Sequence, residues 1–346
     1  MFYAGGITMI NKIAIAGCGN VGAALLELLH EKRAELKSKY GFEYIVTLIS
    51  GRSKGTVMNP DGLNIEEIID ELRENGSFKK FPQASGSFSE LLEKSGATIL
   101  AEATPTDLTT GEPGLSHVMS ALEMGVNVTT TNKGPIALKF SELNLAAEKS
   151  GAKLRYEGVI MAGTPVINGV TAGLAGCEIQ KAEGILNGTT NFILTKMAEG
   201  KTYLSALTEA TELGYAEADP TGDVEGWDAA VKVSIMAKIF FNKDMPVSEI
   251  DRTGITAITS EDIDAARKVS CAIKLIAGIK NDNGKLSGYV KPMKVPFLAP
   301  LASINGAVNA LTVTTDNLGD VTFIGAGAGR RETAQALLAD IIAMVR

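Results

Sequence analysis

The stretch Lys12–Gly22, which reads KIAIAGCGNVG, decides the fold of the N-terminal half of this chain. It opens as a short apolar strand, and a helical pattern continues from Ala23 to Tyr40. Gly17 permits a tight turn, Gly19 lets phosphates approach the backbone, and Gly22 lets the helix pack on the strand. Strand, glycine turn and helix in this order predict a dinucleotide-binding unit; a glycine-rich turn in an unrelated sheet is the alternative. The cofactor contacts expected at this turn are Gly17, Gly19, Asn20, Val21 and Gly22.

The second predicted strand, residues 45–50, ends at basic and hydroxyl side chains. An NAD-selective site usually has Asp or Glu near this strand end, where it holds the ribose 2′-hydroxyl. Arg52, Ser53 and Lys54 stand there instead and better suit the 2′-phosphate of NADP. We therefore expect NADP or NAD as cofactor, with NADP favoured. The alternative is that these basic residues serve solubility alone.

Two later predicted strands, residues 98–103 and 126–130, each end in a polar loop. Loops at the carboxyl ends of parallel strands are where ligands bind in open α/β sheets. Thr104 and Pro105 are therefore expected beside the cofactor, and Lys133 near its nicotinamide. A surface lysine in a turn is the alternative for Lys133.

Composition limits the classes of function that this chain can have. Its 346 residues are enough for two domains, and 45% hydrophobic with 21% charged residues is ordinary for a globular protein. A net charge of −7 argues against nucleic-acid and anionic-membrane partners. No apolar run approaches the roughly 20 residues of a membrane helix, and residues 1–9 lack the features of a signal peptide. The three cysteines form no CxxC pair, so we expect a cytoplasmic location.

A candidate for the chemistry lies in residues 214–232, which hold five carboxylates and one lysine. Asp228 and Lys232 are four residues apart, so a helix there places both on one face. The only histidines, His30 and His117, lie in helical patterns and are expected to be surface or packing residues. Acid–base chemistry must then come from Lys, Asp, Glu or Tyr. The segment predicts a site for a cationic, amino-bearing substrate beside a proton-transfer group.

The domain organisation follows from a change of pattern near residue 153. We expect an α/β fold with a Rossmann dinucleotide-binding domain in residues 1–152 and an α+β substrate domain in residues 153–322. Residues 323–346 are expected to pack back on the nucleotide domain through a last helix. Within the substrate domain, one of the predicted helices spans residues 265–274.

Taken together, these residues resemble the homoserine dehydrogenase family. The combination of the acidic segment, residues 214–232, with the run NGTTNFIL, residues 187–194, is especially specific for this family. The other motifs that carry the resemblance are the glycine turn, Glu102–Thr106, Gly111–Gly114, Thr131–Lys133, Glu157–Pro165 and Gly325–Gly329. The resemblance implies reversible NAD(P)-dependent reduction of L-aspartate 4-semialdehyde to L-homoserine, in threonine, methionine and isoleucine biosynthesis. It also implies a homodimer built by the substrate-domain sheet, in a short form without a C-terminal regulatory domain.

The resemblance also assigns roles within the site. It makes Lys232 the proton donor, with Asp228 beside it, and places Lys133 near the reacting carbon, so which lysine moves the proton stays open. Thr189 and Thr190 follow a glycine and either bind the substrate carboxylate or cap a helix. The expected substrate-binding residues are Gly188, Thr189, Tyr215, Glu217, Asp223 and Asp228.

Two further sites rest on the resemblance. It implies a structural sodium ion at Glu157, Ile160, Ala162 and Thr164, where the unaided interpretation is an ordinary interdomain turn. It places Gly327 in the cofactor cleft. The alternatives to homoserine dehydrogenase are an NAD(P) oxidoreductase acting on another amino alcohol and a non-catalytic nucleotide-binding sensor.

Overall fold

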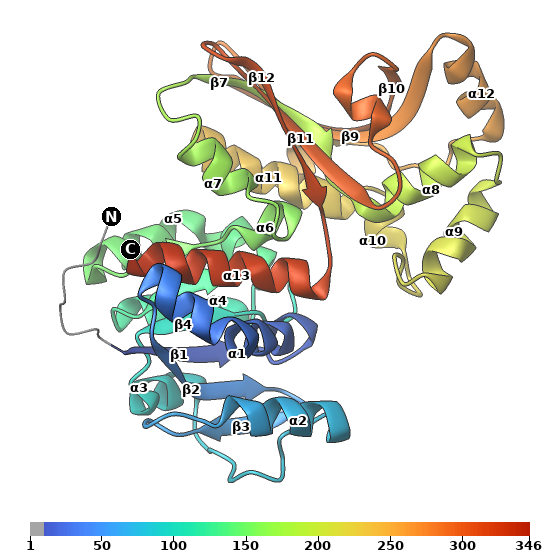
Figure 1. Ribbon diagram of the computed structural model, residues 1–346. Helices are drawn as coiled ribbons and strands as arrows, with labels where there is room; N and C mark the ends of the chain where they lie inside the picture. Colours follow the sequence, from blue (N-terminus) through green and yellow to red (C-terminus); the bar gives the residue numbers. More distant parts are fainter. Residues whose placement is uncertain (1–9) are drawn as a thin grey trace. The chain divides into compact units, whose positions relative to one another are not determined.

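The structure, a computed structural model, describes residues 10–346 (Figure 1). The expectation that no signal peptide opens the chain concerns residues 1–9 and lies outside the described residues. The chain divides into two compact units. Among the described residues, unit 1 comprises residues 10–163 and 329–346, and unit 2 comprises residues 164–328. In the described part of the chain no helix is long and apolar enough to cross a membrane.

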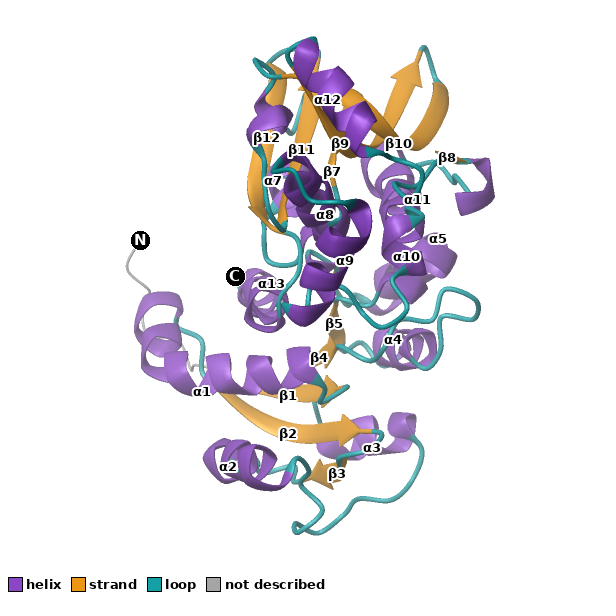
Figure 2. Cartoon of the chain, turned by 90° about the vertical axis from the view of Figure 1, so that its right-hand side faces the viewer, coloured by secondary structure: helices purple, strands orange, loops and turns teal. Residues whose placement is uncertain are grey.

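Unit 1 is built on a six-stranded sheet in the order β3-β2-β1-β4-β5-β6. Its strands are parallel except β3, which pairs antiparallel with β2 as a hairpin (Figure 2). The strands are β1 (Asn11–Ala16), β2 (Tyr44–Gly51), β3 (Gly55–Met58), β4 (Ile99–Glu102), β5 (Asn127–Thr130) and β6 (Leu154–Arg155). This is the strand order of a dinucleotide-binding sheet, and the predicted fold class is confirmed.

Helices of unit 1 cover this sheet. They are α1 (Asn20–Tyr40), α2 (Ile65–Asn75), α3 (Phe88–Ser95), α4 (Gly114–Glu123), α5 (Lys133–Ser150), α6 (Gly158–Met161) and α13 (Arg330–Val345). The core contains β1, β2 and α1, with Leu25 and Leu26 of α1 fully buried. Gly41, in the left-handed region at φ 64°, ends α1 and turns the chain back toward β2.

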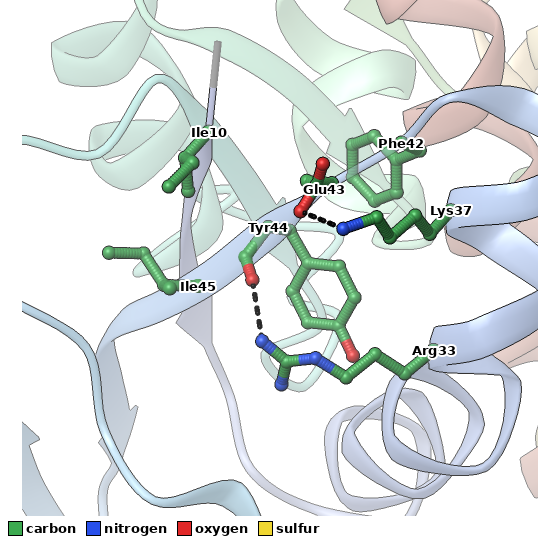
Figure 3. Close-up of a pocket in the computed structure, with 7 residues that line it drawn as sticks. All are labelled: Ile10, Arg33, Lys37, Phe42, Glu43, Tyr44 and Ile45. Atoms are coloured by element: carbon green, nitrogen blue, oxygen red, sulfur yellow. Dashed lines mark hydrogen bonds and ion pairs between the residues drawn. The ribbon is translucent and has the colours of Figure 1, made fainter. Parts of the chain in front are cut away.

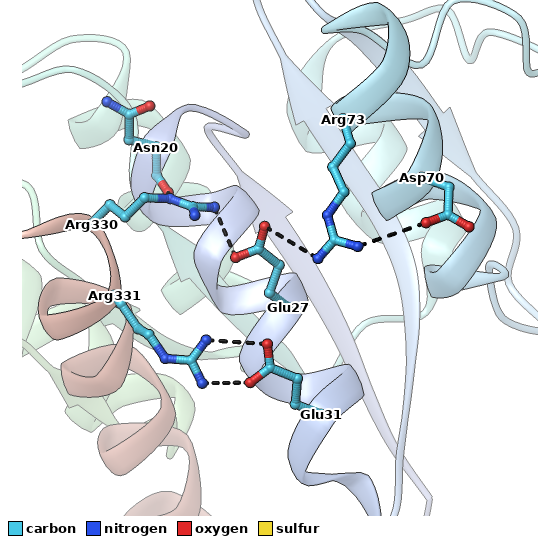
Figure 4. Close-up of polar contacts among 7 residues, drawn as sticks. All are labelled: Asn20, Glu27, Glu31, Asp70, Arg73, Arg330 and Arg331. Carbon is cyan, nitrogen blue, oxygen red and sulfur yellow. Dashed lines mark hydrogen bonds and ion pairs between the residues drawn. The ribbon is translucent and has the colours of Figure 1, made fainter.

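The last helix, α13, packs along α1 as predicted (Figure 1). Leu337 and Ile341 of α13 are fully buried in the same core as α1. Arg330 and Arg331 at its start form ion pairs with Glu27 and Glu31 of α1 (Figure 4). Although α13 comes last in the sequence, it is a structural part of unit 1.

The unit boundary differs from the expected division at residue 152. Strand β6 pairs with β5, and α13 contacts α6, so residues 153–163 belong to unit 1. At the other end the expected division at residue 322 falls inside β12 (Gly319–Ala326), a strand of unit 2. The chain therefore passes from one unit to the other at residues 163–164 and 328–329.

Unit 2 has a second six-stranded sheet, in the order β12-β11-β7-β9-β10-β8. It is antiparallel except for the short β8, which runs parallel to β10. Its strands are β7 (Ile179–Ile185), β8 (Asp251–Arg252), β9 (Cys271–Asp282), β10 (Lys285–Pro296), β11 (Val308–Thr315) and β12 (Gly319–Ala326). Its α-helices are α7 (Val166–Thr171), α8 (Gly188–Ala198), α9 (Tyr203–Glu212), α10 (Thr221–Val224), α11 (Trp227–Phe241) and α12 (Ser260–Lys268).

One predicted helix of unit 2 is wrong at its end. The helix expected over residues 265–274 stops at Lys268, and Cys271–Lys274 open the long strand β9. Ser270 takes up the left-handed region at φ 56°, which ends the helical path. The apolar residues Ile273, Leu275 and Ile276 are buried by strand pairing with β10, so tertiary contacts override the local helical pattern.

Candidate active site

The glycine turn of unit 1 has the shape that a diphosphate requires. Gly17 has φ 88°, and a Cβ added to it would lie 2.5 Å from the backbone of Ala103. A Cβ on Gly22 would lie 2.1 Å from the carbonyl oxygen of Gly17, so helix and strand touch at this point. A Cβ on Gly19 would meet nothing within 4 Å. The close packing behind the turn and the open space at Gly19 fit a bound phosphate group.

The N-terminus of α1 follows this turn, and no nearby acidic side chain on the helix offsets its partial positive charge. No side chain caps it at Gly19, and its first turn, which begins with Asn20 and Val21, contains no acidic residue. Uncapped backbone N–H groups and the positive end of the helix dipole favour an anion. These residues therefore fit the dinucleotide that the glycine pattern predicts.

The basic residues expected at the ribose form the turn between β2 and β3. Arg52 and Ser53 are exposed, and Lys54 is half-buried. Within the described chain neither basic side chain forms an ion pair. Lys54 lies close enough to the glycine turn for its charge to lower the pKa of Cys18, although burial outweighs it and raises that pKa to about 11. The hairpin thus brings the positive charge of Lys54 close to the glycine turn.

A buried carboxylate, Glu102, organises the loops after β4 and β5. It accepts hydrogen bonds from the backbone N–H of Thr104 (2.8 Å), from the Thr104 hydroxyl, and from the hydroxyl of Thr130 (2.8 Å). The side-chain amide of Asn132 donates to the carbonyls of Thr104 (3.3 Å) and Pro105 (3.4 Å). Burial raises the pKa of Glu102, while these hydrogen bonds oppose the rise.

This network joins residues that the sequence places in separate loops. Asn132 is also the N-cap of α5, accepting from Gly134 N–H at 3.0 Å, and Lys133 is the first helical residue. Thr104, Pro105 and Lys133 therefore stand at one end of the sheet. The sequence pattern gives no role to Glu102; an acidic residue closing an apolar strand is the available signal.

Unit 2 brings together the central residues of the acidic segment. Lys232 Nζ lies 2.8 Å from Oδ2 of Asp228, one turn earlier on α11, and donates to the carbonyl oxygen of Leu186 at 2.6 Å. Lys232 is only 6% exposed. The predicted pairing of these two side chains on one helix face is present.

Asn187 connects this pair to a second carboxylate. Its Nδ2 donates to Asp223 Oδ1 at 2.6 Å and to Asp228 Oδ2 at 3.1 Å. Its Oδ1 accepts from the backbone N–H of Thr190 at 2.9 Å and so caps α8. Asn187 has no role in the sequence predictions, although an Asn directly before a helix is a recognisable N-cap. The four side chains Asn187, Asp223, Asp228 and Lys232 are hereafter called the acid–lysine cluster.

The electrostatics of the acid–lysine cluster favour a cationic ligand. Burial raises the pKa of Asp223, the amide of Asn187 lowers it, and the charge of Asp228 raises it further. Two carboxylates held on one amide repel each other, and the charge of Lys232 offsets part of this repulsion. A substrate ammonium group at Asp223 would add a further favourable interaction.

The neighbouring predicted residues have more varied surroundings. The hydroxyl of Thr189 donates to the carbonyl of Tyr215 at 2.6 Å, and the Tyr215 ring packs against Phe192. Neither Thr189 nor Thr190 is the helix cap, because Asn187 takes that position. Thr190 is fully buried and its hydroxyl donates to Asn187, so it is not placed to bind a substrate. A Cβ on Gly188 would lie 2.7 Å from the carbonyl of Ala307.

The remaining acids of the segment lie outside the cluster. Glu217 is exposed and forms no hydrogen bond with the described residues. Asp219 accepts from Thr221 N–H at 3.1 Å, and Glu225 accepts from the Thr256 hydroxyl at 2.8 Å. Asp219 and Glu225 therefore shape the loop.

The residues expected at a sodium ion divide between the units. Glu157, Ile160 and Ala162 are buried in unit 1, while Thr164 opens unit 2 and donates to Ala326 O at 3.0 Å. Ala162 has φ 46°, an unusual value for a residue with a side chain. Among the described residues, no group of three or more His, Cys, Asp or Glu side chains is arranged to hold a metal. Within unit 1, the carboxylate of Glu157 and the backbone oxygens of Ile160 and Ala162 are the kind of donor that a hard monovalent cation prefers.

Gly327 lies where another side chain crosses the backbone. A Cβ on Gly327 would lie 2.0 Å from the amide of Asn309. That amide is fully buried, and within the described chain neither its oxygen nor its nitrogen has a hydrogen-bond partner. Packing on Asn309 is therefore a sufficient reason for glycine at this position.

A small cavity of about 90 Å³ lies elsewhere in unit 1 (Figure 3). It is lined by Arg33 and Lys37 of α1 and by the start of β2. Both basic side chains have partners there, the carbonyl of Tyr44 and the carboxylate of Glu43. Ligands of open α/β sheets bind at the carboxyl ends of the strands, so this cavity is not the candidate site.

Comparisons with known proteins show the family to which this chain is similar. The model of the homoserine dehydrogenase family matches residues 165–342, and that of the homoserine dehydrogenase NAD-binding domain matches residues 17–157. An NAD(+)-dependent homoserine dehydrogenase of Pseudomonas canavaninivorans is 42% identical over 96% of this chain and 95% of its own length. A homoserine dehydrogenase of Methanocaldococcus jannaschii is 38% identical over 95% of this chain and 97% of its own length.

A solved structure is similar over the same extent. A hyperthermophilic archaeal homoserine dehydrogenase mutant in complex with NADPH has a TM-score of 0.84 and 32% identity, covering 97% of this chain and 98% of that chain. Both halves of the sequence match the family, and a relative more than 40% identical spans nearly the whole chain. The chain therefore belongs to the homoserine dehydrogenase family.

Proposed function

We propose that this chain carries out the reaction of its family through the acid–lysine cluster. The reaction is the reversible NAD(P)-dependent interconversion of L-homoserine and L-aspartate 4-semialdehyde. The nicotinamide, when bound, accepts or returns the hydride. The observation that carries the proposal is a buried lysine held against Asp228 and the Leu186 carbonyl, one amide away from Asp223.

Lys232 is assigned the proton transfer. Asp228 and the carbonyl of Leu186 hold Nζ in place, so a substrate oxygen that reaches it meets an oriented amine. The neutral amine is the form that takes a proton from the hydroxyl during oxidation, and the ammonium is the form that returns it during reduction. Lys133, at the start of α5, is the alternative proton carrier.

Asp223 and Asp228 are assigned to the substrate ammonium group, with Glu217 as an outer acid. Gly188, Thr189 and Tyr215 border the cluster and are assigned to the rest of the substrate. The raised pKa of Asp223 supports this role, because a cation that binds there lowers the pKa again and gains binding energy. Another amino alcohol fits the same charges, and a non-catalytic sensor has no need of the Asp228–Lys232 pair.

One set of assays tests the reaction and the proton carrier. Protein given L-homoserine with NADP or NAD is expected to form reduced cofactor, and other amino alcohols should be poorer substrates. Lys232→Met should lower kcat about 100-fold or more, in the range of lost general acid–base catalysis. Lys133→Met tests the alternative proton carrier and should lower kcat less than Lys232→Met does. Absence of reduced cofactor from both dinucleotides would refute the activity, and a larger loss in the Lys133 variant would reassign the proton.

We infer that the cofactor preferred is NADP. Support comes from Arg52 and Lys54, which stand without ion-pair partners on the β2–β3 turn where an acidic residue would select NAD. Arg52→Ala and Lys54→Ala should raise KM for NADP about tenfold each and leave KM for NAD nearly unchanged. Equal changes for the two cofactors would contradict 2′-phosphate recognition.

We further propose a structural sodium ion at Glu157, Ile160, Ala162 and Thr164, cofactor contacts of Gly327, a homodimer through the unit 2 sheet and a cytoplasmic location. The buried Glu157 and the unusual backbone of Ala162 support the ion. Replacing sodium by choline in the buffer should lower the melting temperature of wild type and not of Glu157→Gln.

The dimer is tested by sedimentation, which should give twice the mass of one chain. A monomer at micromolar concentration would oppose the dimer.

A further inference from the structure

Lys274 lies in β9 with its amine in the interior of unit 2. Only 2% of the residue is exposed. Its Nζ lies 3.1 Å from Asn191 Oδ1 and 3.1 Å from Asn305 Oδ1, and it also donates to the carbonyl of Ile304. Within the described part of the chain, none of its hydrogen-bond partners carries a negative charge.

Burying a cation without a counter-charge costs desolvation free energy, so other interactions of Lys274 must offset this cost. Burial lowers the pKa of Lys274 to about 8, which leaves the amine mainly protonated at neutral pH. An ammonium has three N–H donors, and three neutral oxygens surround this one. An apolar side chain of similar length would avoid the desolvation cost. The three hydrogen bonds of Lys274, which join Asn191, Ile304 and Asn305, are therefore the interactions that offset its burial.

Those groups belong to the first turn of α8 and to the segment before β11. Asn191 is almost fully buried, and its Nδ2 donates to the carbonyls of Ile304 (3.1 Å) and Val308 (3.1 Å). The carbonyl of Ile304 thus accepts from both Lys274 and Asn191. The backbone N–H of Asn191 donates to the carbonyl of Asn187, one helical turn earlier. Lys274 and Asn191 therefore anchor the helix start that carries Asn187.

We propose that Lys274 is a positioning residue for the reaction: through Asn191 it fixes the start of α8, so that Asn187 meets both Asp223 and Asp228. This inference rests on the active site proposed above. Asn187 contacts both carboxylates at hydrogen-bond distance, so a small shift of α8 breaks one contact. Lys274 acts on Asn187 through Asn191, and this role requires no contact between Lys274 and the substrate.

The first test compares Lys274→Met with Lys280→Met. Lys280 lies on the same strand but is exposed and paired with Asp282 at 2.7 Å, so it controls for the substitution. Lys274→Met should raise KM for homoserine and lower kcat/KM at least about tenfold. The dissociation constant for the nicotinamide cofactor should stay within about twofold, because the glycine turn belongs to unit 1. Lys280→Met should match wild type in KM, in kcat/KM and in the dissociation constant of the cofactor.

A double-mutant cycle separates positioning from a general loss of stability. Once Asn187→Ala has removed the contact with the carboxylates, adding Lys274→Met should lower kcat/KM by less than about twofold more. Additive losses would show that Lys274 acts by another route. If Lys274→Met does not fold, Asn305→Ala removes one acceptor at an exposed position and should raise KM for homoserine in the same direction.

The outcomes distinguish this inference from the proposed site. If Asn187→Ala leaves kcat/KM unchanged, the acid–lysine cluster is not the active site. If Asn187→Ala lowers it while Lys274→Met and Asn305→Ala match wild type, the cluster stands and the positioning role of Lys274 is refuted.

Discussion

At the residue scale, the acid–lysine cluster depends on a side chain that carries no charge. Spacing alone places Asp228 and Lys232 together, because residues four apart share a helix face. Asp223 is joined to them by the amide of Asn187, which follows another strand, β7. Glu217 is predicted to bind the substrate for the same reason as Asp223, but its side chain is exposed. Charge pattern therefore predicts the type of site, and tertiary contacts choose its members.

The two tasks of Asn187 can be separated by substitution. Asn187→Ser keeps a helix cap and loses the bridge, whereas Asn187→Ala loses both. We expect both variants to lower kcat/KM for homoserine about tenfold or more, since Asp223 and Asp228 lose their common donor. Only the alanine variant should lose about 1 kcal/mol of unfolding free energy. Activity that follows stability across the two variants would contradict the bridging role.

His117 is a packing residue, as predicted, and makes folding sensitive to acid. It stacks on Phe88 at 4.0 Å, and burial lowers its pKa from 6.5 to about 4. The unfolded chain takes up this proton first, so the contribution is complete above pH 6.5 and is lost as pH falls toward 4.

Denaturant unfolding at several pH values measures this effect. Between pH 6.5 and 4, wild type should lose up to about 1.4 kcal/mol per pH unit more than His117→Leu does. His30→Leu, at an exposed position, is the control and should keep the wild-type slope. Parallel slopes for wild type and His117→Leu would mean that His117 titrates normally.

At the scale of elements, the strand–turn–helix at β1 and α1 is predictable and the start of β9 is not. The glycine turn works through contacts a few residues apart, such as Gly22 against Gly17. Strand β9 runs through Cys271–Lys274, where the sequence pattern predicts a helix, and pairing with β10 decides in favour of the strand. Local steric rules appear in a short stretch of sequence, whereas sheet pairing does not.

Two glycines of the same turn should respond differently to alanine. Gly22→Ala places a Cβ 2.1 Å from the Gly17 carbonyl, so helix and strand must separate and unit 1 loses stability. Gly19→Ala meets no protein atom within 4 Å, so the fold should keep its melting temperature. It should instead weaken cofactor binding about tenfold or more, because the Cβ enters the space left for phosphate. Calorimetry and cofactor titration measure the two effects; unchanged affinity in Gly19→Ala would place the phosphates elsewhere.

At the scale of the whole molecule, the sequence predicts two folded regions and the return of the last helix. Its division points are misplaced because the pattern changes near residue 153, whereas β6 and α6 still belong to unit 1. The boundary depends on which sheet the two-residue strand β6 joins. Strand β6 pairs with β5 of unit 1, and the hydrophobic periodicity of so short a strand does not predict this pairing.

The contribution of α13 to unit 1 can be measured with two of its residues. Leu337 is fully buried in the core shared with α1, so Leu337→Ala should cost about 2–5 kcal/mol of unfolding free energy. Arg331 is exposed and pairs with Glu31 at the surface, so Arg331→Ala should leave the melting temperature nearly unchanged. Thermal unfolding monitored by cofactor binding follows unit 1 directly. Equal effects of the two variants would argue that α13 does not complete this core.

The place of α13 also sets an order of events during synthesis on the ribosome. Unit 2 is a continuous stretch of chain that emerges before residue 329, whereas the core of unit 1 lacks Leu337, Leu338 and Ile341 until α13 is made. Domains generally fold as they emerge. The nucleotide-binding region, although translated first, is therefore the last to be completed, and until then its exposed apolar surface is a natural target for chaperones.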